Sequence, residues 1–467
     1  MKKNIFAIFL LLLGFITCFA QQEADGQQSA VNGQNSAPIS ITMDKAVEMA
    51  IENNLGLKQV ILSNEAQRRA AQMPWNVFVP TVDIGGTFGR LNRKPEGIEL
   101  PPPFPPGYTI GGGNQWVLFG SLQLTLNLNI GTFVGIKQTI EEYEAGKITI
   151  EKAKLQLGRD VRKAYYQILL TKEYLELLRE SYANADRQVA IAQANYRGGL
   201  IPEVNLLQVQ VARENLKPQI DDAENLYRMA MASFALFLGL PYDSEFELAT
   251  LPGNVEFIIL EAEDLISRAA AHKPEIEELR RLLSAIKAQK TSLFYNLYTP
   301  TLSLGFNMDP TFQKDPIKDN WFNHNDWRQN TGMFRITLAW RLNALFPFTM
   351  EYQAYHAIND AVKAMELGLT QAIQGTEAEV YNIILQLEKT RTTAEAQKMT
   401  VDLAERTLRL SETAYRNGLK QFIEVQNDEL ALRQARLGAL QQNYNYLMGL
   451  LDLEYAIGVP FGSLGGR

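Results

Sequence analysis

Apolar side chains recur at alternating spacings of three and four residues through two very long stretches of the chain. This spacing is typical of helices packed as coiled coils, and about five heptads fit into each stretch. At about 1.5 Å per residue, a helix over residues 135–196 would span roughly 90 Å. The two series are Val161, Ala164, Ile168, Thr171, Leu175, Leu178, Tyr182, Ala185, Val189, Ala192 and Tyr196, then Val380, Ile383, Leu387, Thr390, Ala394, Gln397, Val401, Ala404, Leu408, Ser411 and Tyr415.

Two shorter stretches alternate between apolar and polar side chains, residues 122–130 strictly and residues 334–342 except at Ala339. This period of two predicts strands with two unlike faces, and residues 82–88 and 302–308 are weaker candidates for their partners. The pattern fits either an outer-membrane barrel wall or a soluble sheet with one buried face. In the barrel interpretation, the side chains facing the lumen are Gln123, Thr125, Asn127, Arg335 and Arg341.

The chain is an internal duplication with an offset of about 220 residues. The string NYRGGL at 195–200 returns as AYRNGL at 414–419, and GLP at 239–241 returns as GVP at 458–460. Residues 75–82 similarly match residues 295–302. Gly199 and Gly418 follow the long heptad stretches, where glycine favours the left-handed conformation that ends a helix. Both hexapeptides are therefore predicted to be the turns of helical hairpins.

Each half is predicted to contain a helix, a strand pair, a very long helix, a turn and a second long helix. The first repeat covers residues 41–240, with a β-hairpin at about 80–130 and a helical hairpin at about 135–239. A linker over 241–262 leads to the second repeat at 263–460. That repeat has its β-hairpin at about 300–342 and its helical hairpin at about 351–456, and residues 461–467 form a tail.

The first 40 residues indicate export. Lys2 and Lys3 precede an apolar run, and the sequence Cys18-Phe19-Ala20 then resembles a signal-peptide cleavage site. We therefore expect a signal peptide over 1–20 and a flexible leader, rich in Gln, Ser and Ala, over 21–40. Cys18 is the sole cysteine, so cleavage would leave a mature chain without thiols, although lipid attachment at Cys18 is the alternative.

The composition argues against nucleic-acid binding and catalysis. The formal net charge is −7, which disfavours contacts to phosphates. The three histidines, His272, His324 and His356, are widely separated and lack metal-ligand spacing. The sequence contains no GxSxG, GxxxxGK[ST] or GxGxxG motif. We expect no enzyme activity, no cofactor and no metal.

Three features favour the membrane interpretation of the strands. Aromatic residues cluster beside them, as they do at membrane interfaces. Long irregular loops over 101–113 and 321–327 join each strand pair, and the signal peptide supplies a route to the outer membrane. Four strands cannot close a barrel, and open edges in lipid cost several kcal/mol per unpaired group. Three chains would provide twelve strands, enough for a water-filled lumen.

The sequence closely resembles the TolC-type outer-membrane efflux protein family, also called outer membrane factors. The resemblance covers about 41–460 and includes the opening helix ITMDKAVEMAIENNLGLK at 41–58, the turns YRGGL and YRNGL, and the half-ends GLP and GVP. It implies a mixed α and β fold: a homotrimer with a 12-stranded β-barrel in outer-membrane lipid, continued by a coiled-coil tunnel through the periplasm. It further implies a periplasmic adaptor protein and an inner-membrane transporter, proton-driven or of the ABC type, as partners.

The resemblance also assigns roles to residues near the tips of the hairpins. Gly199, Leu200, Gly418 and Leu419 would dock the adaptor. Glu424, Asn427 and Asn205 match the acidic residues that narrow the tunnel, with amides at two of these three positions. Tyr415 and Lys420 match residues that hold the tip closed. The implied function is a passive exit duct of a tripartite efflux pump. The alternatives are the outer-membrane conduit of a type I polypeptide secretion system and an exported coiled-coil scaffold without a pore.

Overall fold

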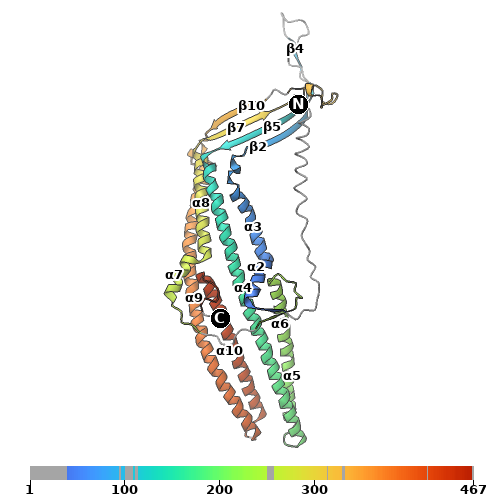
Figure 1. The fold of residues 1–467 in the computed structure, drawn as a ribbon, viewed down its shortest axis with the longest axis vertical. Helices are drawn as coiled ribbons and strands as arrows, with labels where there is room; N and C mark the ends of the chain where they lie inside the picture. The colour runs from blue at the N-terminus through green and yellow to red at the C-terminus, as the bar shows by residue number, and fades with distance from the viewer. Residues whose placement is uncertain are drawn as a thin grey trace. The chain divides into compact units, whose positions relative to one another are not determined.

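The computed structural model describes residues 39–93, 96–99, 109–110, 114–249, 257–312, 314–328, 332–417 and 419–464. The signal peptide predicted over 1–20 and most of the leader lie outside these residues. The chain divides into two compact units. In the small unit, β1 (Ile39–Ile41) pairs with β6 (Phe246–Leu248) as a two-stranded sheet. The large unit contains the rest of the described chain (Figure 1).

The large unit repeats one order of elements twice, as the sequence predicts, but two helices rather than one precede each strand pair. Each half starts with two short helices, continues through a strand pair into a very long helix, and returns along a second helical segment (Figure 1). The first half contains α2 (Met43–Asn53), α3 (Leu55–Gln72), η1 (Pro74–Phe78), β2 (Thr81–Arg90), β5 (Trp116–Leu128), α4 (Ile130–Arg197), α5 (Glu203–Glu214) and α6 (Leu216–Phe237). The second contains α7 (Ala262–His272), α8 (Pro274–Tyr298), β7 (Thr301–Met308), β10 (Met333–Ala339), η3 (Asn343–Leu345), α9 (Met350–Arg416) and α10 (Phe422–Ile457). Short additional pieces are β3 (Ile98–Glu99), β4 (Thr109–Ile110), β8 (Thr311–Phe312), η2 (His324–Asp326) and β9 (Trp327–Arg328).

The ends of the long helices show the duplication in the backbone. The N–H of Leu200 donates to the carbonyl of Asn195 at 2.9 Å, and Gly199 has a φ of +70°. The same bond recurs 219 residues later, from Leu419 to Ala414 at 2.9 Å. These are the bonds of a Schellman motif, so Gly199 terminates its helix as predicted. Gly418 lies outside the described residues.

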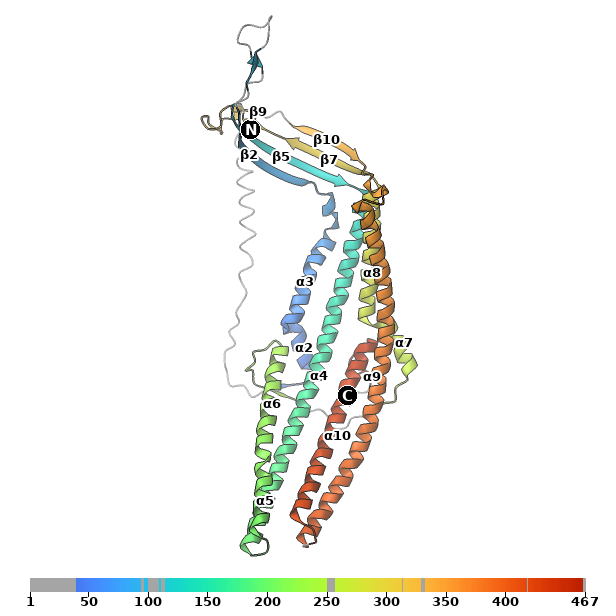
Figure 2. The ribbon, with the colours of Figure 1, turned by 180° about the vertical axis from the view of Figure 1, so that it is seen from behind.

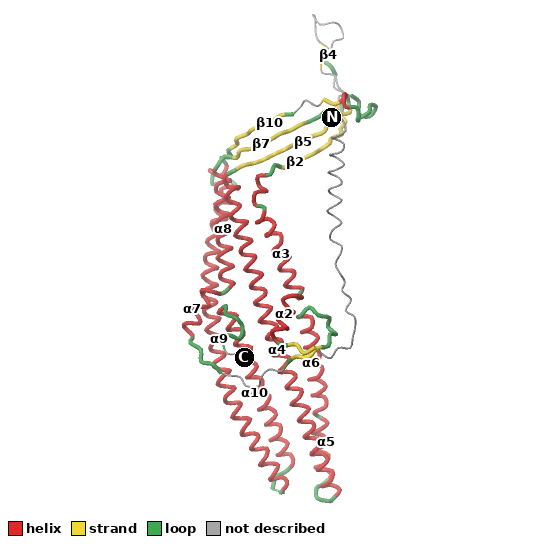
Figure 3. Tube along the Cα trace, viewed as in Figure 1, coloured by secondary structure: helices red, strands yellow, loops and turns green. Residues whose placement is uncertain are grey.

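The four longer strands of the sheet are antiparallel in the order β10-β7-β5-β2 (Figure 3), and the short β8 and β9 extend the same sheet beside β5. The register places Leu304 of β7 opposite Leu126 of β5 and Ile336 of β10. Because side chains alternate between faces, the residues of one register row lie on the same face of the sheet. One face of the sheet is therefore apolar across all four strands, and the other is largely polar.

Two strand boundaries differ from the predicted ones. β5 ends at Leu128, since the side chain of Asn129 accepts the N–H of Gly131 at 2.7 Å and starts α4. β10 ends at Ala339 because the chain turns into η3 shortly afterwards. Arg341 therefore lies beyond the strand, whereas it was expected within it.

The return segment of the first half is also not one helix as predicted. It divides into α5 and α6 at Asn215, whereas α10 is continuous over 36 residues. Pro218 explains the division, because its ring opposes the carbonyl of the residue four positions earlier and it has no N–H to donate. That residue is Glu214, the last residue of α5.

The long helices are the frame on which the other elements pack. α4 and α9 have 68 and 67 residues, and at about 1.5 Å per residue each spans roughly 100 Å. α4 contacts α3 and α8, while α9 contacts α8 and α10 (Figure 2). Most heptad positions are buried, including the polar pair Thr171 and Thr390. Each threonine hydroxyl donates to the carbonyl four residues earlier, at 2.9 and 2.7 Å, so the buried hydroxyls are satisfied.

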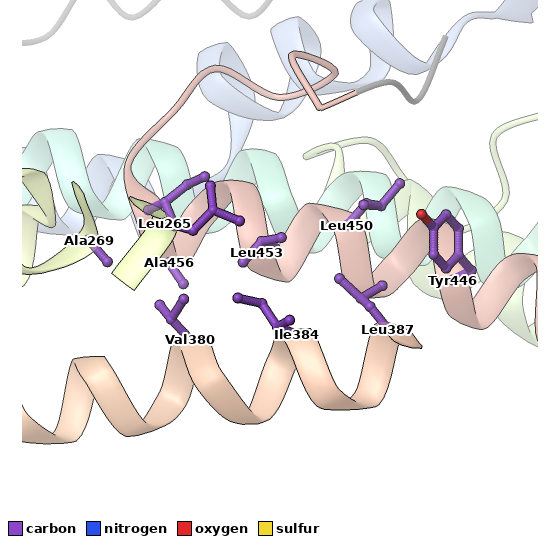
Figure 4. Close-up of a cluster of buried hydrophobic side chains, with 10 residues drawn as sticks. Leu265, Ala269, Val380, Ile384, Leu387, Tyr446, Leu450, Leu453 and Ala456 are labelled. Atoms are coloured by element: carbon purple, nitrogen blue, oxygen red, sulfur yellow. The ribbon is translucent and has the colours of Figure 1, made fainter. Parts of the chain in front are cut away.

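A core cluster of buried residues joins α7, α9 and α10. Val380, Ile384 and Leu387 of α9 point toward Leu450 and Leu453 of α10 (Figure 4). Val380 and Leu453 are fully buried. Contacts of this kind hold the second hairpin together well away from its turn.

The close approach of α4 and α8 requires glycine at position 131. A Cβ on Gly131 would lie 2.4 Å from the backbone oxygen of Ser292, and the Ser292 hydroxyl donates to the Gly131 carbonyl at 2.7 Å. We expect Gly131→Ala to destabilise the protein by about 1–3 kcal/mol, because backbone atoms must move to relieve the clash. Urea unfolding followed by circular dichroism measures this effect.

Gly135 provides the matched control, since it lies one turn along α4 and also faces Ser292. Its Cβ would meet only the Ser292 hydroxyl, at 3.3 Å. Gly135→Ala should be neutral or stabilising by up to about 1 kcal/mol, because alanine favours a helix interior. Equal destabilisation by the two substitutions would contradict the close approach at Gly131.

Candidate functional site: the hairpin tips and the two-faced sheet

The two hairpin turns present a leucine each at their exposed ends. Leu200 is 75% exposed and Leu419 is 81% exposed. In each turn the backbone N–H of the leucine donates to the carbonyl five residues earlier, and this bond holds the turn while the leucine side chain stays outside the helix. The four residues predicted to dock a partner therefore include two apolar groups at the surface.

Lys420 belongs to a polar cluster within the second hairpin. Its ammonium lies 2.6 Å from the carboxylate of Asp428 and 2.5 Å from the hydroxyl of Ser411. The Ser411 hydroxyl also donates to Asp428. Lys420 and Ser411 hold the pKa of Asp428 below its usual range, since both stabilise the carboxylate. Lys420 thus forms its ion pair with Asp428 of the same chain, and the sequence patterns did not predict a role for Asp428.

Glu424 is the third residue of α10 and caps its start. Its carboxylate accepts the backbone N–H of Gln421 at 2.9 Å, in a capping box that satisfies an otherwise unpaired donor. Glu424 and Asn427 are both exposed and lie one turn apart on α10. Asn205 is half-buried on α5, in the other hairpin.

Tyr415 packs where the two hairpins meet. Its ring lies 5.9 Å from that of Phe422, and it borders a buried cluster that includes Val189 of α4 and Leu206 of α5. Burial raises the pKa of the Tyr415 hydroxyl. Tyr415 therefore joins the hairpins through apolar contact.

The sheet brings four of the five predicted lumen residues onto one face. Gln123 and Thr125 pair with Asn307 and Gly305, and Gly305 pairs in turn with Arg335. Asn127 continues this face at the next row. Arg341 follows the end of β10 and is not part of the paired face.

The opposite face of the sheet is apolar and open to its surroundings in the single chain. Val82, Ile84, Phe334, Ile336 and Leu338 are all exposed, with exposed fractions from 59% to 74%. They lie in register rows with Leu122, Leu124, Leu302, Leu304 and Phe306. Contiguous apolar surface of this extent is characteristic of contact with another protein or with lipid.

The described residues hold no group of three or more His, Cys, Asp or Glu side chains placed to bind a metal ion. No helix in that part of the chain has an apolar stretch long enough to cross a membrane.

Comparisons with known proteins agree with this geometry. The chain is 14% identical to the CmeC outer membrane channel of Campylobacter jejuni, with a TM-score of 0.72 over 92% of this chain and 90% of that one. It is 13% identical to the outer membrane protein VceC of Vibrio cholerae, with a TM-score of 0.69 over 90% of this chain and 96% of that one. A curated relative, nodulation protein T of Rhizobium leguminosarum bv. trifolii, is 18% identical over 88% of this chain and 85% of its own length.

The arrangement of a sheet with one apolar face on two long helical hairpins is shared with the CmeC outer membrane channel and the outer membrane protein VceC. Residues 46–240 match the model of the outer membrane efflux protein family, which confirms the resemblance predicted from the duplicated layout. The mixed α and β fold and the duplicated layout are confirmed as well. The solved structures that share this fold include outer membrane channels.

Proposed function

We propose that three copies of this chain form the exit duct of a tripartite efflux pump. The apolar face of the sheet is the observation that carries this proposal, because it is suited to lipid and its reverse face is polar. The family match to efflux proteins favours export of small molecules over secretion of polypeptides. It also favours a channel over a scaffold without a pore.

The strand order supports assembly into a closed barrel. Among the described strands of the sheet, β2 pairs only with β5 and β10 pairs only with β7, so each presents an open edge. An open edge in lipid leaves backbone groups without partners, which costs several kcal/mol for each group. Pairing β10 of one copy with β2 of the next would close twelve strands in a homotrimer, with Gln123, Thr125, Asn127 and Arg335 facing the lumen.

The helical hairpins would extend this barrel as a tunnel through the periplasm. At their tips, the exposed Leu200 and Leu419 and the adjacent Gly199 and Gly418 would dock a periplasmic adaptor protein. The adaptor would in turn connect to an inner-membrane transporter that supplies the energy. We propose the following domain boundaries for this channel: a signal peptide over 1–20, two structural repeats over 41–240 and 263–460, and a linker between the repeats.

Glu424 would form the constriction of the tunnel. With one exposed carboxylate per chain, three copies would make a ring of three negative charges, which favours cations. Asn427 and Asn205 would add amides near the same opening. In the closed state, Tyr415 and the Lys420–Asp428 pair would hold the tip of the second hairpin in place.

Single-channel recording in a planar bilayer tests the proposal. We expect discrete openings with a cation preference that falls in Glu424→Ala. An unchanged preference would exclude Glu424 as the constriction. If the wild-type protein stays closed, Lys420→Ala combined with Tyr415→Phe should produce openings, and silence of that variant would overturn the channel proposal.

A further inference from the structure

A cavity of about 400 Å³ lies between the two helical hairpins, above their turns. It is bounded by α4 and α5 of the first half and by α9 and α10 of the second. Its volume is within the usual range of small-molecule sites. The cavity is separate from the exposed carboxylate of Glu424 at the start of α10, and it lies on the side where the hairpins contact one another.

The wall of this cavity is mainly apolar. Ile191 and Val209 line it from the first hairpin, and Leu408, Phe422 and Val425 line it from the second. Phe422 and Val209 also belong to the buried cluster that joins the hairpins. This wall is suited to an aromatic or branched apolar body, which would gain from leaving water.

One end of the cavity carries charge. Among the lining residues, Glu412 and Glu429 are acidic and Arg187 is basic, and the guanidinium of Arg187 donates to Asn184 on its own helix. The amide of Gln188 on α4 donates to the carboxylate of Glu429 on α10 at 3.3 Å. The charged lining is therefore acidic by one group and includes a contact between the two hairpins.

Glu429 is a partly buried carboxylate in the lining of this cavity. Burial raises its pKa, since the carboxylate loses hydration, and the charge of Glu412 on α9 adds to the effect. The bond from Gln188 and the charge of Arg433 on α10 offset only part of it. A cation in the cavity would stabilise the ionised form of Glu429.

We propose that this cavity is a binding site for an organic cation with an apolar aromatic body, its charge beside Glu429 and its body against Ile191, Phe422 and Val425. Such a ligand would contact both hairpins at once, and its occupancy would oppose their separation. Tyr415 of the proposed closed tip also lines this cavity, but binding there does not depend on conduction.

Tetraphenylphosphonium is a suitable probe, because it surrounds a single positive charge with four phenyl rings. Tetraphenylborate has the same shape with the opposite charge and serves as its control. We expect calorimetry on the purified protein in lipid nanodiscs, corrected with protein-free nanodiscs, to show saturable binding of the phosphonium. The borate should bind at least about tenfold more weakly, a change that corresponds to about 1.4 kcal/mol.

Two substitutions test separately the negative charge of Glu429 and the free volume of the cavity. Glu429→Gln keeps the size of the side chain and its capacity to bond Gln188, and it should weaken phosphonium binding about tenfold. Ile191→Trp fills the cavity from a position that is 58% exposed, so it should fold normally and also weaken binding. Asp402→Asn, at an exposed carboxylate of α9 outside the cavity lining, should leave binding unchanged.

Absence of saturable phosphonium binding to the wild-type protein would overturn the assignment, as would wild-type affinity in both cavity variants. Equal affinity for the two probe ions would also overturn it, because the carboxylate would then have no role. The binding measurement needs no ion flow. Probe binding by the wild-type protein, together with silence of both the wild type and the Lys420→Ala, Tyr415→Phe variant, would refute the duct and keep this site.

Discussion

Leu304→Arg is expected to remove most of the protein from the outer membrane. Leu304 lies near the middle of β7, between Leu126 and Ile336 on the apolar face. An arginine on the lipid face of a membrane barrel costs about 2–4 kcal/mol near the bilayer centre. The proposed trimer would incur this cost three times. Quantification of trimer in purified outer-membrane fractions measures the loss.

Ser303→Arg is the matched control, because it adds the same side chain one residue earlier. Ser303 pairs with Asn127 and Thr337 on the polar face, which the proposed barrel turns toward water. This variant should reach the outer membrane at close to the wild-type level. If the two arginine variants were lost equally, the sheet would not be arranged with one face in lipid.

Leu453→Ala is expected to destabilise the helical part of the protein by about 2–5 kcal/mol. Leu453 is fully buried between α9 and α10, where it faces Val380 and Ile384 (Figure 4). Truncation removes the apolar contacts and leaves a cavity that the two packed helices can collapse only partly. Urea unfolding followed by helical circular dichroism gives the free-energy difference.

Leu430→Ala, on the same helix, is the control for replacing a leucine that is not buried in the core. Leu430 is 41% exposed, so its truncation removes few buried contacts and should cost under about 1 kcal/mol. A loss at Leu430 equal to that at Leu453 would mean that the cluster between α9 and α10 does not stabilise the second hairpin.

Much of the fold could be predicted because its signals are local and repeated. The heptad spacing that buries Val161 and Val380 is visible in sequence, since it follows directly from helix geometry. The alternation around Thr125 likewise defines the two faces of β5, because neighbouring strand residues point to opposite sides. The role of Gly199 could also be predicted, because a helix that ends in a Schellman motif requires a left-handed residue and glycine adopts that conformation readily.

The details of the tip could not be predicted in this way. The contact of Lys420 with Asp428 depends on how the turn places α10 beside α9, which no periodic pattern encodes. The capping role of Glu424 has a local signature, but Gln421 is not a usual N-cap residue, so the capping box was not recognised. The contact from Gln188 to Glu429 joins residues 241 positions apart. Only the packing of the two hairpins brings these side chains together.

The division at Asn215 makes the two hairpins mechanically unequal, although they arose by duplication. A helix bends most easily where its ladder of hydrogen bonds is interrupted, and Pro218 interrupts the ladder between α5 and α6. The continuous α10 has no such joint over its 36 residues. A sideways force on the tips would therefore bend the first hairpin at Asn215. The same force would rotate the second hairpin as a rigid body, because α10 is continuous.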